Sequence, residues 1–125
     1  MKHALLALLL VTTSLHAAEP KESFPDFMRL SKVQAAKAAR RQAEVDFAAG
    51  DYRILVYGLR SSDSTFDLRL AKEGVHVRAI AGCIVNDGIL EGARIYNEVM
   101  REKLKAKLGR DVFNNKDEAR KGNEK

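Results

Sequence analysis

The segment from Tyr52 to Ala81 has the sequence YRILVYGLRSSDSTFDLRLAKEGVHVRAIA, and it predicts a strand, a helix and a second strand. Its two ends, residues 52–57 and 75–81, are short runs rich in β-branched and aromatic residues, which favour strands, and the first is expected to be buried on both faces. Residues 64–73 between them fit a helix. About 16 residues separate the strands, which is the length that a right-handed parallel crossover requires.

A helix is predicted on each side of this segment. The first spans residues 23–48, because Ser23 and Asp26 have the spacing of a reciprocal N-terminal cap and Pro25 fits the first turn. Gly50 is expected to end it. Its apolar side is a thin stripe made largely of alanine, with Val33, Ala36, Ala43 and Phe47.

The second flanking helix spans residues 86–108 and has the strongest 3.6-residue periodicity in the chain. Asn86 is a favourable N-cap, and Gly109 is a favourable stop. The apolar residues of the stripe are Ile89, Ala93, Tyr96, Met100 and Leu104.

This order of elements predicts a small α/β domain over residues 18–113, an α-β-α-β-α unit with a two-stranded parallel sheet flanked by helices. So small a sheet has exposed edges. Two alternatives are open: residues 111–113 add a strand, or a second copy pairs along an edge and makes a homodimer. Residues 114–125 are almost wholly polar and predict a disordered tail.

Residues 1–17 have the features of a secretory signal peptide, with Lys2 near the start, an apolar stretch and small residues at the exit. The polar residues 12–14 leave the apolar stretch shorter than the roughly 20 residues of a bilayer span, so an uncleaved anchor is the less favoured alternative. Cleavage is expected after Ala17, with Ala18 as the alternative. The predicted location is the periplasm or the extracellular medium, with no membrane span left after cleavage.

Composition argues against several function classes. The chain has 22 Lys and Arg against 17 Asp and Glu, a net charge of +5, and removal of Lys2 with the signal peptide leaves +4. That excess is far below the dense basic runs of nucleic-acid binders, so nucleic acid is an unlikely partner. His76 and Cys83 are the only histidine and cysteine of the mature chain. We therefore predict no metal site, no cofactor and no histidine-based triad.

The loops that follow the two strands are the best candidate for a ligand site, because the carboxyl ends of parallel strands form a crevice in α/β proteins. These loops span residues 58–64 and 82–86. Their predicted ligand-binding residues are Gly58, Arg60, Ser61, Ser62, Ser64, Gly82, Cys83 and Asn86. Hydroxyl groups, an arginine and a helix N-terminus fit a small anionic ligand. The alternative is an ordinary helix-capping loop, since no phosphate-binding glycine motif is present.

Cys83 is the candidate catalytic residue. It lies three residues ahead of the predicted helix 86–108, whose positive end would favour a thiolate. The favoured alternative is inert packing, because unpaired cysteines are usually buried and Ile84 and Val85 beside it are apolar.

The sequence does not decide whether the protein is an enzyme. We expect a non-catalytic binding or interaction module that uses the crevice or a sheet edge to hold a small anionic ligand or a protein partner. The alternative is a thiol-dependent enzyme or redox sensor that acts through Cys83.

Overall fold

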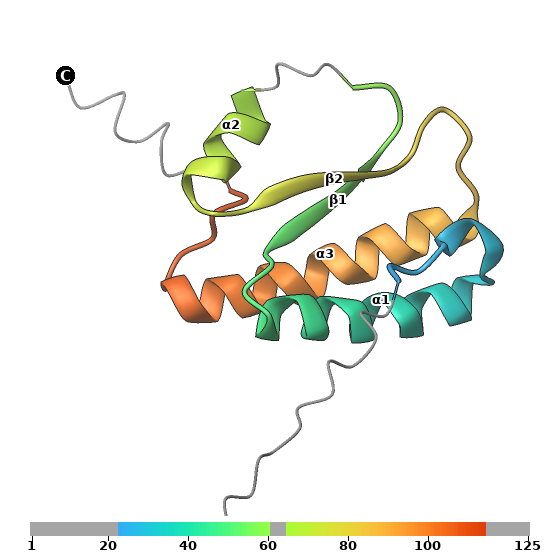
Figure 1. Cartoon of the computed structure of the whole chain (residues 1–125), viewed down its shortest axis with the longest axis horizontal. Helices are drawn as coiled ribbons and strands as arrows, with labels where there is room; N and C mark the ends of the chain where they lie inside the picture. The colour runs from blue at the N-terminus through green and yellow to red at the C-terminus, as the bar shows by residue number, and fades with distance from the viewer. Residues whose placement is uncertain (1–22, 61–64, 115–125) are drawn as a thin grey trace, which may run out of the picture.

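A computed structural model describes residues 23–60 and 65–114, and Figure 1 shows their arrangement. The elements are the 3₁₀ turn η1 (Phe27–Arg29), helix α1 (Lys32–Ala48), strand β1 (Arg53–Tyr57), helix α2 (Thr65–Lys72), strand β2 (His76–Ala81) and helix α3 (Asp87–Leu108). The predicted α/β class and α-β-α-β-α order are confirmed. The predicted signal peptide, and residues 115–125 of the predicted tail, lie outside the described residues.

The sheet consists of β1 and β2, which pair in parallel with Arg53 opposite His76 and Leu55 opposite Arg78. α2 makes the crossover between them, as predicted. The alternative that residues 111–113 add a strand is wrong. They form a turn instead, closed by the Asp111 carboxylate, which accepts a hydrogen bond from the backbone N–H two residues further on (3.1 Å).

The first helix begins later than predicted, at a different cap. Ser31 Oγ accepts a hydrogen bond from the Gln34 N–H (3.2 Å), and Gln34 Oε1 accepts one from the Ser31 N–H (3.0 Å). This capping box fixes the start of α1. The predicted cap at Ser23 is wrong, because residues 23–30 turn through η1 to bury Phe27.

α1 packs on α3 through small side chains, and the two helices lie side by side and run in the same direction (Figure 1). The buried positions of α1 are Ala35, Ala39, Ala43 and Asp46. Of the predicted stripe, Ala43 is buried and Ala36 and Phe47 are partly buried against the core, whereas Val33 is 78% exposed and its place in the stripe is wrong. Alanine occurs on several sides of this helix, so periodicity alone does not define the face that meets α3.

α3 forms the centre of the core. The predicted stripe is confirmed, since its five residues Ile89, Ala93, Tyr96, Met100 and Leu104 are all buried. The predicted ends are confirmed too. The Asn86 side chain caps the N-terminus, and Gly109 ends the helix in the left-handed conformation (φ 71°) that glycine adopts without strain.

Two glycines of α3 make room for the segment before α1. The Phe27 ring lies against Gly92, where an added Cβ would stand 2.6–2.8 Å from three ring atoms. At Gly88 an added Cβ would collide with the backbone carbonyl of Phe27. These two glycines, one turn apart, let Phe27 and η1 sit directly on the helix backbone.

The strands are less buried than predicted. In β1 only Leu55 is fully buried, and β2 has no fully buried residue, so the expectation of a strand covered on both faces is wrong. The strands are covered unequally by helices. The long helix α3 packs on β1, whereas β2 is covered by the short helix α2. In residues 23–60 and 65–114 no helix is long and apolar enough to cross a membrane.

We predict that Gly92→Ala destabilises the protein. Alanine favours a helix interior over glycine by about 1 kcal/mol, but overpacking a core costs about 1–3 kcal/mol, and here the ring contact leaves no space for a methyl group. The expected net loss is about 1–2 kcal/mol in the free energy of unfolding, measured by denaturant titration. Gly82→Ala is the matched control, because an added Cβ there meets nothing within 4 Å. A Gly92→Ala protein more stable than the parent would contradict the packing.

Candidate functional site

The two loops of the predicted crevice begin side by side. The Gly58 N–H donates to the carbonyl oxygens of Ala81 (3.2 Å) and Gly82 (3.1 Å), so the carboxyl ends of β1 and β2 are joined at this point. The structure therefore brings Gly58 and Gly82 together as expected. Ser61, Ser62 and Ser64 lie outside the described residues.

The polar side chains predicted to bind a ligand here already have partners within the fold. Arg60 forms an ion pair with Asp67 of α2 (2.6 Å), in which both side chains are partly buried. Asn86 Oδ1 accepts a hydrogen bond from the Ile89 N–H (3.0 Å), and its Nδ2 donates to the Met28 carbonyl (2.9 Å). Arg60 thus ties the first loop to α2, and Asn86 ties the second to η1.

Cys83 is exposed, so the expectation of a buried packing cysteine is wrong. The chain leaves the sheet at Gly82 and passes along the surface before Asn86 starts α3, which places the apolar neighbour Ile84 (78% exposed) in solvent. His76 stands at the opposite end of β2 from Cys83, as the strand length predicts. Leu59 on the neighbouring loop is 88% exposed, so this end of the sheet carries an apolar surface.

Two cavities in the described part of the chain lie away from these loops. One, of about 640 Å³, runs along the outer side of α1 and is lined by Pro25, Leu30, Lys37 and Ala38 among others. The other, of about 170 Å³, lies between Phe24 and β2. Neither is lined by any of the predicted ligand-binding residues.

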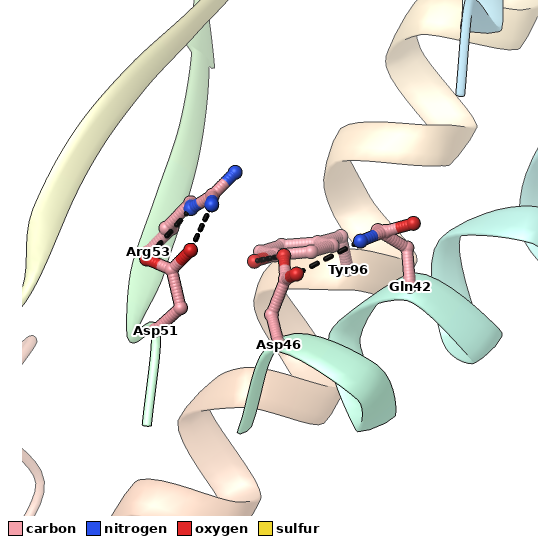
Figure 2. A network of polar contacts seen from close by, with 5 residues as sticks. All are labelled: Gln42, Asp46, Asp51, Arg53 and Tyr96. Carbon is pink, nitrogen blue, oxygen red and sulfur yellow. Dashed lines mark hydrogen bonds and ion pairs between the residues drawn. The ribbon is translucent and has the colours of Figure 1, made fainter. Parts of the chain in front are cut away.

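A buried polar network joins α1 to α3 (Figure 2). Asp46 is 5% exposed, and its carboxylate accepts hydrogen bonds from Tyr96 Oη (2.6 Å) and from Gln42 Nε2 (2.8 Å). Burial, together with the hydrogen bond to Asp46, raises the pKa of Tyr96 far above its ordinary value. Tyr96 thus remains a donor, and because its side chain is fully buried it is a structural link and not a catalytic group.

Arg53 stands beside this network at the start of β1 (Figure 2). Its guanidinium donates to the Asp51 carboxylate (2.9 Å from Nε), and this hydrogen bond raises the pKa of Arg53 above its ordinary value. The guanidinium carbons of Arg53 and Arg78 lie 6.0 and 4.1 Å from the ring centroid of Phe24. The two arginines therefore hold the segment before η1 against the sheet through cation–π contacts.

The outer edge of β1 is closed by one side chain of α3. Asn97 Oδ1 accepts a hydrogen bond from the Leu55 N–H (2.7 Å), and Asn97 Nδ2 donates to the Leu55 carbonyl (2.8 Å). The amide thus makes the pair of hydrogen bonds that a neighbouring strand would make. This role of Asn97 was not predicted from the sequence, where its only sign is a polar residue beside the apolar stripe of α3.

The outer edge of β2 has no such cover. The His76 N–H donates to the Tyr52 carbonyl (2.9 Å), and backbone directions alternate along a strand, so His76 and Arg78 bond to β1. Val77 and Ala79 therefore direct their backbone N–H and C=O groups away from the sheet. Arg78 and Ala79 are exposed, and in the described part of the chain no third strand lies beside them. This edge is the best candidate for a binding site.

Metal chemistry has no evident centre in the part of the chain that the structure describes. Residues 23–60 and 65–114 contain no group of three or more histidine, cysteine, aspartate or glutamate side chains placed to hold one ion.

We predict that Tyr96→Phe costs about 1–3 kcal/mol of unfolding free energy at neutral pH, because it removes one of the hydrogen bonds to the buried Asp46 carboxylate. It also changes the response to alkali. The raised pKa of folded Tyr96 means that its contribution is complete below about pH 10, the ordinary tyrosine value, and is lost as the pH rises beyond it. The parent should therefore lose stability above pH 10 more steeply than the variant in denaturant titrations.

Tyr57→Phe is the control for this experiment, since Tyr57 is an exposed tyrosine at the end of β1. It should change the free energy by less than about 0.5 kcal/mol. Equal alkaline slopes for the parent and Tyr96→Phe would show that Tyr96 is not held protonated by the fold.

Comparison with known proteins identifies no relative of the chain: no protein-family model, no curated protein and no solved structure matches it. The features of the chain that bear on function are therefore the closed edge of β1, the open edge of β2 and the exposed loops at the end of the sheet.

Proposed function

We propose that the protein is a non-catalytic interaction module that binds a partner strand along the outer edge of β2. The observation that carries this proposal is the difference between the two edges: Asn97 hydrogen-bonds the centre of β1, whereas the backbone groups of Val77 and Ala79 point outward. Strand addition to an open edge is a common way for proteins to bind an extended segment.

A polypeptide partner is better supported than a small anion. Arg60 and Asn86, the polar groups expected to hold an anion, are engaged by Asp67, Ile89 and Met28. The large exposed groups at this end of the sheet are apolar, and apolar surface is what a protein partner covers.

We further propose that the protein works outside the cytoplasm, in the periplasm or the extracellular medium. Support comes from residues 1–17, with their basic start, apolar stretch and small-residue exit.

A second candidate function is thiol chemistry at Cys83, and the exposure of that side chain favours it. An exposed thiol in an oxidising compartment is available to oxidants and to other thiols. The proposal remains second because His76, the only histidine of the predicted mature chain, stands at the far end of β2.

We predict that Cys83 in the native protein is alkylated at a rate similar to that in denaturant. The thiol is exposed, and a non-catalytic interaction module does not need to activate it. Iodoacetamide labelling against pH, followed by mass spectrometry, measures both rates. A native rate well above the denatured one, with a midpoint below about pH 7.5, would favour the thiol-dependent function instead.

Site-specific photocrosslinking in the producing cells tests the interaction module. A benzoylphenylalanine at Gly82, just beyond the end of β2, should give a discrete adduct, and the second substitution Ala79→Pro should abolish that adduct by removing an outward N–H. The same crosslinker at Val33, which is exposed on α1, is the control.

An adduct that survives Ala79→Pro, or that also forms from Val33, would overturn binding at the β2 edge. N-terminal sequencing of the secreted or periplasmic protein in the same preparation reports the export step, with Ala18 or Glu19 expected as the first residue.

A further inference from the structure

We propose that the partner strand is β2 of a second copy of this chain, paired antiparallel about a twofold axis to give a four-stranded sheet. This inference rests on the proposed use of the β2 edge. It adds the identity of the partner, the direction of the pairing and its register.

The difference between the edges favours a closed dimer. A sheet with two open edges would continue to add copies, as filaments do. Here the central residue of β1, Leu55, is already hydrogen-bonded by Asn97, so β2 is the strand whose central backbone groups are available to another copy. A twofold pairing uses that edge once in each chain and leaves β1, with its centre bonded to Asn97, at each end of the four-stranded sheet.

The residues of β2 define the favourable register. The hydrogen-bonded pairs of an antiparallel ladder require opposed residues whose backbone groups point outward, and Val77 and Ala79 meet that condition. With Ala79 on the axis, the smallest side chain of the pair lies at the centre. Arg78 then stands opposite Ile80 of the second copy, whereas an axis at Arg78 would place two arginines directly opposite each other, which is destabilising.

The helices leave room for this approach. α1 packs on α3, α3 packs on β1, and α2 reaches β2 from the crossover. The exposure of His76, Arg78 and Ala79 shows that neither α1 nor α3 covers the β2 edge. Two short strands bury less than the roughly 1,600 Å² of a standard interface, so the dimer should dissociate on dilution.

The pairing also separates the cysteines. Cys83 lies four residues beyond Ala79, so the two Cys83 residues of a dimer centred there are on the order of 27 Å apart along the strands, at about 3.4 Å per residue. A disulfide requires Cα atoms within about 7 Å. The dimer is therefore noncovalent, and it does not use Cys83.

Analytical ultracentrifugation of the chain that begins at Ala18 tests the proposal over the micromolar range of concentration. The weight-average mass should rise from that of one chain to that of two and no further. Ala79→Pro should remain at the mass of one chain, because it removes an outward N–H without removing a bond between β1 and β2. Ala79→Val keeps that N–H and should still dimerise.

Amide hydrogen exchange on the parent protein is a second test, which does not depend on whether Ala79→Pro folds. Exchange at Val77 and Ala79 should slow as the concentration rises, whereas exchange at Leu55, already bonded to Asn97, should not change. A protein that stays at the mass of one chain at every concentration overturns the second copy as partner. The proposed binding at the β2 edge is retained if the crosslinker at position 82 still forms an adduct with another protein and Ala79→Pro abolishes that adduct. It is overturned if no such adduct forms.

Association that is lost in Leu59→Ser with Ile84→Ser but retained in Ala79→Pro would overturn the register. That result would place the contact on the apolar loops at the end of the sheet, where both side chains are exposed.

Discussion

The close contact between α1 and α3 is the constraint on which the rest of the fold depends. Alanines on α1 bring the two helices together, and Gly88 and Gly92 of α3 admit Phe27 against the same helix. The Asp46 carboxylate, buried in this contact, needs hydrogen-bond donors, and Tyr96 and Gln42 supply them. A carboxylate left without donors in this position would cost several kcal/mol. The polar pair therefore specifies which residues of the two helices face each other, a choice that alanines alone leave open.

The position of α3 also determines which edge of the sheet is hydrogen-bonded, because Asn97 of this helix bonds Leu55 of β1. Asn97 follows Tyr96 directly in the sequence, so the residue that holds α1 and the residue that holds β1 lie on adjacent positions of one helix. A shift of α3 along α1 would move both contacts together. The outer edge of β2 stays open in the described part of the chain, because α3 packs mainly on β1, and α2, which packs on β2, has only 8 residues.

Sequence patterns predict the parts of this fold that local chemistry determines. α3 follows from its long aliphatic stripe and from Asn86 and Gly109 at its ends, and the parallel crossover follows from the spacing of two β-branched runs. The start of α1 does not follow from local sequence, because Ser23 and Ser31 are both possible N-caps. The choice depends on the packing of Phe27 against two glycines of α3, far along the chain. For the candidate site, sequence placed Gly58 and Gly82 together but expected Cys83 to be buried. Apolar neighbours predict burial only where the chain passes through the core, and this loop leaves it.

A domain with one central helix and two strands meets a geometric limit. A side-chain amide offers one donor and one acceptor, so α3 satisfies the outer edge of β1 at one residue, Leu55, the centre of a strand of 5 residues. The second strand has 6 residues, α3 packs mainly on β1, and the outward backbone groups of β2 depend on water or on another chain. An exposed edge carries a risk of indiscriminate pairing, which natural proteins limit with charges and bulges. β2 has both, Arg78 at its middle and a register slip at its end. These features restrict the open edge to a few residues around Ala79, so the partner strand that we propose has few registers in which to pair.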